Sequence, residues 1–350
     1  MGGVAGLVAV AVMLPAAPAP APAAFPGENG RIAFTATRAH LEPCDSSPSG
    51  SAYVYDEGIF TMNPDGSDSR QLTDSQTSTC GLCHKCYPGA DRDPTFSPNG
   101  MWIAFIHQES GSAGREHYVF LMRVSGGDLH EVTHHTAFEP SFSPSGRRIA
   151  FASLKGIWIV GTNGGDERRI TDEGREPAFF PRSNRIAFTR LADRPLPFGG
   201  RLFSIRSDGS DLRRLATRGS EPDVSPDGNP AHLASYGRHA SETGHASIVF
   251  MKFHSAQSGQ RQSSSDIYLM RADGTHKRPL TAAEPGEYNF EPAFSPNGKR
   301  IAFTNSHRAG ISVMRVDGSH KQAVIPDPLP FGVSDPAEVS LEQPSWGPAP

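Results

Sequence analysis

The sequence predicts an all-β protein, a six-bladed β-propeller whose blades are four-stranded antiparallel sheets. Three observations carry this prediction. One unit recurs in phase along the chain, turn dipeptides occupy fixed places within each unit, and a fragment near the C-terminus completes an incomplete first copy. Repeats of this size are typical of propellers, in which radial stacking covers both faces of every sheet.

The recurring unit reads acid-Pro-x-Phe-Ser-Pro-x-Gly, then Ile-Ala-Phe, a second apolar run, Asp-Gly and Leu-Thr. The last copy is the clearest, with the first motif at 291–298, Ile-Ala-Phe at 301–303 and the second run at 311–314. Pro-Asn-Gly and Asp-Gly supply the positive φ that tight hairpins need, so each unit divides into four short strands. The runs are rich in Ile, Phe and Val, as expected of strands with both faces buried.

Five complete copies and one split copy fill most of the chain. The complete copies give blades two to six, at about residues 93–133, 139–171, 176–216, 221–281 and 291–325. The first copy begins at Asn29-Gly30 and lacks its acid-Pro-x-Phe strand, whereas a matching fragment lies at 343–348. We therefore expect blade one to be shared between 30–73 and 343–348, so that the ring closes without a bare sheet edge.

Several segments interrupt the repeat pattern and are expected to be loops. They are residues 36–57, residues 74–92 and a stretch of blade five at about 229–246. The Ser-, Gln- and Gly-rich segment 254–264 is interpreted as a further loop of blade five. The run that starts at Ile248 then supplies the second strand of that blade.

The N-terminus carries a candidate export signal. Residues 2–14 are apolar and uncharged, and an Ala/Pro run follows them. Thirteen apolar residues are too few to span a bilayer but fit the apolar region of a signal peptide, although no Lys or Arg precedes them. We expect residues 1–24 to be a signal peptide or a disordered leader and 25–350 to be a single propeller. The protein is then exported, periplasmic or extracellular, and has no membrane span once the leader is removed.

Composition limits the choice of partner. The chain has 33 Lys and Arg against 37 Asp and Glu, a formal net charge of −4. This balance argues against nucleic acid, because binding to phosphates needs a surplus of basic residues. We expect a monomer that binds a protein or peptide.

All four cysteines lie early in the chain, at Cys44, Cys80, Cys83 and Cys86. In an exported protein an even number of cysteines favours two disulfides, with three pairings open. The competing interpretation is a zinc or iron–sulfur site, since thiolates two residues apart can converge on one metal. In either case the role is structural, because both segments are insertions outside the repeat.

The acid before each repeat proline is the most informative polar position. It is Asp93, Glu139, Glu176, Glu221 and Glu291, with Gln343 in the sixth place. We expect these residues on the innermost strands, beside the central channel. Carboxylates around one narrow opening repel one another, so they need a bound cation, a basic peptide or partial protonation. Ca²⁺ accepts six to eight oxygen ligands and would suit such a ring.

The same recurrence has a structural explanation. Each acid could cap backbone N–H groups where its strand begins, and a repeat protein would copy that solution in every unit. The two explanations are compatible, and the sequence leaves both open.

The repeated PxFSPxG…IAF…DG…LT unit resembles the WD-like β-propeller repeat of TolB-type periplasmic proteins, which also occurs in the propeller domains of some serine peptidases. The resemblance implies an exported propeller that binds a partner in the cell envelope, with a channel mouth that receives peptides and cations. TolB-type proteins carry an additional N-terminal α/β domain. Nothing of that size precedes Gly30, and no G-x-S-x-G motif is present, so we expect a propeller alone.

Two other functions compete with a binding module. One is an enzyme, a lyase or hydrolase of carbohydrates or lactones, with a metal site in the channel. It would need metal-binding histidines, but the scattered histidines, such as His134-His135, show no HxH or HExxH spacing. The other is a purely structural role.

Overall fold

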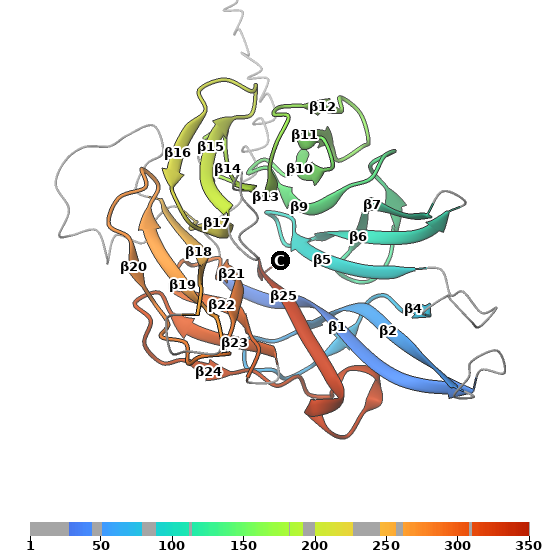
Figure 1. Cartoon of the computed structure of the whole chain (residues 1–350). Helices are drawn as coiled ribbons and strands as arrows, with labels where there is room; N and C mark the ends of the chain where they lie inside the picture. The colour runs from blue at the N-terminus through green and yellow to red at the C-terminus, as the bar shows by residue number, and fades with distance from the viewer. Residues whose placement is uncertain are drawn as a thin grey trace, which may run out of the picture.

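The fold is a closed ring of six antiparallel sheets, which confirms the predicted all-β six-bladed propeller (Figure 1). The computed structural model describes residues 28–43, 51–78, 89–111, 114–181, 183–191, 200–226, 246–256, 262–307 and 310–349. Helical structure among these residues is limited to short 3-10 turns, Pro330–Gly332 and Pro336–Glu338. None of the described helices is long and apolar enough to cross a membrane.

Blades 2 to 6 each consist of four consecutive strands, ordered from the centre of the ring outward. Blade 2 contains β5 (Ala90–Phe96), β6 (Trp102–Gly111), β7 (Gly114–Arg123) and β8 (His130–Glu131). Blade 3 contains β9 (Phe138–Phe142), β10 (Arg148–Ser153), β11 (Gly156–Gly161) and β12 (Arg168–Arg169). Blade 4 contains β13 (Arg175–Phe179), β14 (Arg185–Leu191), β15 (Gly200–Arg206) and β16 (Arg213–Ala216).

The last two complete blades follow the same plan. Blade 5 contains β17 (Ser220–Val224), β18 (Ser247–His254), β19 (Ser264–Arg271) and β20 (Arg278–Pro279). Blade 6 contains β21 (Asn289–Phe294), β22 (Arg300–Asn305), β23 (Gly310–Arg315) and β24 (Gln322–Ala323).

Blade 1 joins the two ends of the described chain, as predicted. Its innermost strand is β25 (Val339–Pro348), which pairs with β1 (Asn29–Pro43) and is followed outward by β2 (Ser51–Met62) and β3 (Arg70–Gln71). Trp346 lies opposite Ile32, is 3% exposed, and donates its indole N–H to the carbonyl oxygen of Gly30 at 3.2 Å. The ring is therefore sealed by antiparallel pairing and by one buried aromatic side chain.

The predicted loop at 36–57 is wrong for most of its length. Strands β1 and β2 continue through this segment as one long hairpin, paired from Ile32–Met62 to Pro43–Ser51. The segment from Thr35 to Leu41 contains neither glycine nor proline and has β-branched threonines at 35 and 37, which favours an extended strand. Within 74–92, β4 (Ser75–Ser78) adds to β2, and β5 already begins at Ala90. Parts of the other expected loops lie outside the described residues.

The hydrophobic core lies between neighbouring blades, because both faces of each sheet carry apolar side chains. Successive residues of β1 point to opposite sides. Phe34 packs in a cluster with Ile311 of blade 6, whereas Ala33 packs in a cluster with Phe96 and Phe105 of blade 2. Stacking in a ring is what covers both faces, since no single blade could do so alone.

The alternation of strand direction gives the ring two distinct faces. In blade 3 the inner strand runs from Glu139 toward the turn 143–147, and the fourth strand follows the turn 161–166. We call the side where the acidic positions lie the mouth face, and the opposite side, formed by these two turns of every blade, the far face. The short hairpin 153–156 and the links between blades lie at the mouth face.

Candidate functional site

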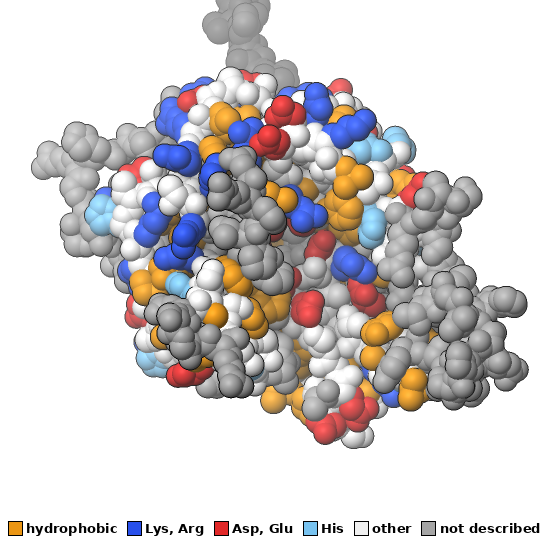
Figure 2. Space-filling view, viewed as in Figure 1, with side chains coloured by type: hydrophobic (Ala, Val, Ile, Leu, Met, Phe, Trp, Pro, Cys, Tyr) orange, Lys and Arg blue, Asp and Glu red, His pale blue; other side chains and the backbone are white. Residues whose placement is uncertain are grey.

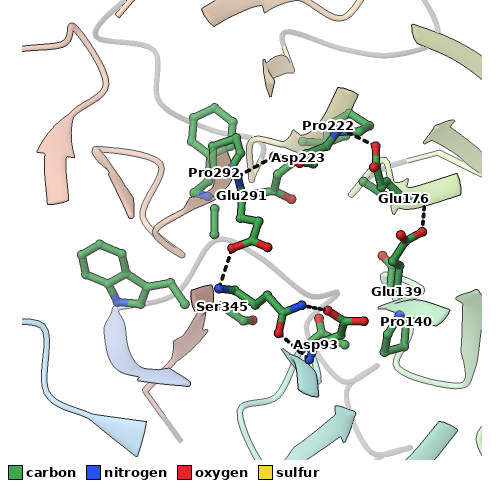
Figure 3. Close-up of a pocket in the computed structure, with 18 of the residues that line it drawn as sticks. Asp93, Glu139, Pro140, Glu176, Pro222, Asp223, Glu291, Pro292 and Ser345 are labelled. Carbon is green, nitrogen blue, oxygen red and sulfur yellow. Dashed lines mark hydrogen bonds between the residues drawn. The ribbon is translucent and has the colours of Figure 1, made fainter. Parts of the chain in front are cut away.

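The six repeat positions singled out in the sequence meet around one central cavity of about 300 Å³ (Figure 3). Each belongs to the innermost strand of a different blade. They are Asp93 on β5, Glu139 on β9, Glu176 on β13, Glu221 on β17, Glu291 on β21 and Gln343 on β25. All six side chains are half-buried, and the prolines that follow them are buried in the wall. The cavity is therefore lined by one acid-Pro pair per blade, with glutamine in the sixth.

A shared backbone conformation places these side chains. All six residues have φ between 52° and 55°, in the left-handed region that non-glycine residues seldom adopt. Strand pairing is irregular around the same positions, for example between Arg175 and Ala178 and between Ser220 and Asp223. A β-bulge of this kind re-aims a side chain that would otherwise follow the alternation of the strand. The bulges therefore place the six side chains around the cavity.

The carboxyl groups are joined into a chain of hydrogen bonds that passes from blade to blade. The backbone N–H of Glu176 donates to Oε2 of Glu139 at 2.6 Å, and the N–H of Glu221 donates to Oε2 of Glu176 at 2.6 Å. The N–H of Glu291 then donates to Oε2 of Glu221 at 2.6 Å. Each acid thus caps the inner strand of the next blade.

Gln343 closes this chain at the junction of the termini. Its backbone N–H donates to Oε2 of Glu291 at 2.7 Å, and its own Oε1 accepts the N–H of Asp93 at 3.0 Å (Figure 3). Its side-chain amide also donates to a carboxylate oxygen of Asp93, which in turn accepts the backbone N–H of Glu139. Each of the six side chains therefore accepts a backbone N–H of the next blade. This is the backbone capping that the sequence left open as one of two explanations.

Burial and mutual repulsion keep much of the ring protonated. Burial, together with the negative charges of Glu176 and Asp93, raises the pKa of Glu139 to about 8. Burial raises the pKa of Glu291 to about 8 against the opposing effect of its hydrogen bonds, and raises that of Glu221 well above the usual value. At neutral pH the ring therefore relieves its repulsion by holding protons, one of the three possibilities predicted from the sequence.

At blades 1 and 2 an arginine, Arg92, lies beside the ring of acids. Nε of Arg92 lies 3.1 Å from Oε1 of Glu57, and the guanidinium lowers the pKa of the neighbouring Asp93. Burial is the larger effect, however, and the pKa of Asp93 is still raised to about 6. Burial likewise raises the pKa of Glu57.

A second layer of the cavity contains an acid that the sequence reasoning missed. Oδ2 of Asp223 accepts the backbone N–H of Phe294 at 2.7 Å, and burial raises its pKa to about 6. Ser345 of blade 1 caps blade 2 in the same way, since its hydroxyl oxygen accepts the N–H of Phe96 at 3.3 Å. The sequence contained a signal for this acid. Among the copies of the acid-Pro motif, the one at Glu221 has a second acid two residues later, at Asp223.

No metal centre is evident in the part of the chain that the structure describes. There, no group of three or more His, Cys, Asp or Glu side chains is placed to hold one ion. Calcium binding by the ring carboxylates stays a prediction. His134 and His135 lie outside the cavity, 3.6 Å from Glu131 and 3.1 Å from Glu167 respectively.

The predicted cysteine site lies outside the described residues. Cys44, Cys80, Cys83 and Cys86 all fall in segments that the structure does not describe. Disulfide or metal binding by these thiols stays a prediction.

Comparison with known proteins gives one consistent relationship in sequence. No family model matches the chain. Over 269 residues it is 25% identical to the Tol-Pal system protein TolB of Francisella tularensis subsp. mediasiatica strain FSC147, covering 73% of this chain and 54% of that protein. TolB of subsp. tularensis strain SCHU S4 matches with the same identity over the same length. The chain spans about half the length of the curated relatives it matches.

Solved structures agree on the fold. TolB from Acinetobacter baumannii superposes with a TM-score of 0.59 at 17% identity, covering 93% of this chain and 68% of that one. A putative TolB from Agrobacterium tumefaciens gives 0.56 at 15% identity, covering 91% and 100%. The chain is therefore similar to TolB both in its repeat sequence and in the propeller that those repeats build.

Proposed function

We propose that this protein is an exported, TolB-like binding module that receives a cationic segment of a protein partner at its mouth face. The observation that carries the proposal is the ring of five carboxyl groups around a single cavity of about 300 Å³. Among the residues described, Arg92 lies beside Asp93 and Arg175 acts on Glu139, but burial and like charges outweigh Arg175 and the pKa of Glu139 stays raised. The relatives named as Tol-Pal system proteins support a partner in the cell envelope.

The chemistry of the ring sets the kind of segment that fits. A lysine or arginine side chain that enters the cavity brings a positive charge. That charge can compensate the carboxylates in place of the protons that they hold when the cavity is empty. Its arrival favours ionisation of Glu139 and Glu291, so binding releases protons and strengthens as the pH rises toward 8. A cavity of this volume admits an extended peptide or one or two side chains, so the partner would insert a terminus or a loop.

Site-specific photo-crosslinking in the native cell envelope tests the proposal. A photo-reactive amino acid at Ala293, which lines the cavity, is expected to give a covalent adduct with a protein. The same amino acid at Met101, exposed on the far face, is the matched control and should not give that adduct. Absence of a protein adduct at Ala293 would overturn the proposal.

The charge requirement is tested separately with tetralysine. The double variant Glu139→Gln with Glu291→Gln keeps hydrogen-bond acceptors at both positions, as Gln343 does naturally. We expect this variant to bind tetralysine at least about tenfold more weakly than the parent at pH 8.5, because two of the charges that attract it are lost. Equal affinities would show that the ring does not select cations.

A further inference from the structure

The charges of the propeller are divided unevenly around the ring. Residues 139–325, which form blades 3 to 6, hold 26 of the 33 Lys and Arg but only 19 of the 37 Asp and Glu. Five of those acids face the cavity rather than the outer surface: Glu139, Glu176, Glu221, Asp223 and Glu291. Among the residues of these blades that the structure describes, outward-facing Lys and Arg therefore outnumber outward-facing Asp and Glu. Figure 2 shows a face with carboxylates near the centre of the ring, and Lys and Arg also gather over its upper and left parts, where Figure 1 places blades 4 and 5.

Much of this basic surface lies at the far face. The turns between the first and second strands carry Arg147-Arg148 in blade 3 and Lys299-Arg300 in blade 6, and all four side chains are exposed. The outer turns add Arg168 and Lys277, also exposed.

The carboxylates of the far-face turns are engaged locally. Asp211 pairs with Arg185 at 2.6 Å and with Arg213 at 2.7 Å. Asp208 and Asp273 accept hydrogen bonds from the hydroxyl and the N–H two residues later in their own turns. These carboxylates stay negatively charged, so the basic character of the far face rests on the larger number of its Arg and Lys residues.

The N-terminal segment joins the propeller at this same face. Strand β1 begins at Asn29, whose side-chain oxygen accepts the N–H of Asn297 at 3.2 Å. Asn297 belongs to the same turn as Lys299. The described chain therefore enters the propeller at the far face.

We propose that the far face of blades 3 to 6 docks on an anionic phospholipid bilayer, with the mouth face turned away from the membrane. A broad array of exposed basic turns suits a planar anionic surface, near which each Lys or Arg strengthens binding by about fivefold. Single-stranded nucleic acid fits less well, because it is held by exposed aromatic rings. The exposed large hydrophobic side chains described on this face are aliphatic, as at Leu212 and Ile325.

Vesicle binding by the full chain tests this inference. The probes are vesicles of phosphatidylcholine alone and vesicles with one-third phosphatidylglycerol, at low salt and at about 0.5 M salt, where surface charges are screened. We expect the phosphatidylglycerol-dependent part of binding to be lost at high salt. The variant Arg147→Glu with Lys299→Glu should lower it on the order of 30-fold, because two basic contacts are removed.

A matched variant separates the far face from general basicity. Lys155→Glu with Arg218→Glu makes the same change of charge at two exposed positions of the mouth face. It should weaken binding to phosphatidylglycerol vesicles by less than about threefold. An equal loss in both variants, or binding that ignores phosphatidylglycerol, would overturn the proposal.

Two further results would overturn the proposal by showing that the far face binds something other than a membrane. Binding of duplex DNA in preference to the vesicles, lost in the far-face variant, would assign the surface to nucleic acid. Salt-sensitive self-association without vesicles, lost in that variant while vesicle binding is absent, would assign it to a second copy. Neither result depends on the ring at the mouth, so failure here leaves the proposed function standing.

Discussion

Two sets of residues in this propeller adopt the same unusual backbone conformation in opposite electrostatic surroundings. The inner set is the ring of Asp93, Glu139, Glu176, Glu221, Glu291 and Gln343. The outer set occupies the turn before each fourth strand and comprises Asp68, Asp128, Asp166, Asp211, His276 and His320. All twelve have φ between 52° and 56°.

Asp211 and Asp68 of the outer set are shifted in the opposite direction from Glu139 and Glu291 of the inner ring. Hydrogen bonds from Arg213 and Arg185 hold the pKa of Asp211 at about 2, and those from Arg31 and Arg70 lower the pKa of Asp68. Burial raises the pKa of Glu139 and Glu291 to about 8. The fold requires the left-handed residue in both places, but Asp211 and Asp68 accept hydrogen bonds from arginine side chains, whereas Glu139, Glu221 and Glu291 accept them from backbone N–H groups. The partner that each copy of the repeat supplies therefore decides the direction in which its acid is shifted.

The two sets also differ in what their hydrogen bonds connect. The arginines of the outer set reach an acid within their own blade, whereas the bonds from backbone N–H groups to the inner ring cross between neighbouring blades. Removing β25, by ending the chain before Val339, deletes Gln343 and opens the ring on both sides. We expect the largest effect of all here, loss of the cooperative unfolding transition seen by circular dichroism.

Trp346→Phe is the control for that truncation. It keeps the strand and an aromatic core residue but removes the indole bond to Gly30. This variant should still unfold in one cooperative step. A truncated chain that melts like the parent would contradict the role of β25 in closing the ring.

Within the outer set, the depth of the arginine should decide the effect of removing its acid. Arg185 is 2% exposed and Arg31 is 20% exposed, so Asp211→Ala leaves a buried guanidinium short of its partner, whereas Asp68→Ala leaves one that water can reach. We expect Asp211→Ala to lower the urea midpoint several times as much as Asp68→Ala. Equal losses would show that burial of the arginine does not matter.

Within the inner ring, replacement of carboxyl groups should change the pH dependence of stability. Glutamate ionises near pH 4.5 in the unfolded chain but near pH 8 at Glu139 and Glu291. Between these values the folded protein binds more protons than the unfolded one, so its stability falls as the pH rises. The parent should lose roughly 2–4 °C of Tm for each kcal/mol of stability lost between pH 5 and pH 8.5.

The double variant Glu139→Gln with Glu291→Gln should flatten this profile. Its Tm is expected to match the parent near pH 5 and to exceed it at pH 8.5, because the two groups that resist ionisation are gone. Glu338→Gln, at an exposed position, is the control and should follow the parent at both values. A double variant that stays as sensitive to pH as the parent would contradict the raised pKa values.

Calcium gives the smallest expected effect. An ion that gathered ring carboxylates would have to displace protons, so any rise in Tm with calcium should be a few degrees at most and larger at pH 8.5 than at pH 6. Differential scanning calorimetry with and without calcium measures it. The Glu139→Gln, Glu291→Gln variant should lose the rise, and an equal rise in both proteins would exclude the ring as the calcium site.

Much of the fold could be predicted because turn residues and apolar runs recur in phase. The closing strand was recognisable from 343–348, which repeats the acid-Pro-x-Phe pattern with Gln and Trp in place of the acid and Phe. The extension of β1 and β2 through 36–57 was missed because only one blade has it, and a comparison between copies treats unshared segments as loops. The absence of glycine and proline from 35–42 was the better guide.

The candidate site could be located from the sequence but not described. The six positions followed from the repeat alone. Glu139 accepts the N–H of the next blade rather than one of its own, and its strand has a bulge at this point. Both features depend on the spacing between blades, which no single repeat unit encodes. The pKa values depend on the same closure. Asp223 was overlooked because its position varies from copy to copy, although it lines the same cavity.

The pairing of β25 with β1 also has a consequence for biosynthesis. The ribosome makes Asn29–Pro43 among the first residues of the propeller and Val339–Pro348 among the last. The inner edge of β1 therefore has no pairing strand until translation is nearly finished. Closure of the ring is therefore coupled to completion of synthesis, and an unfinished chain keeps the inner edge of β1 unpaired.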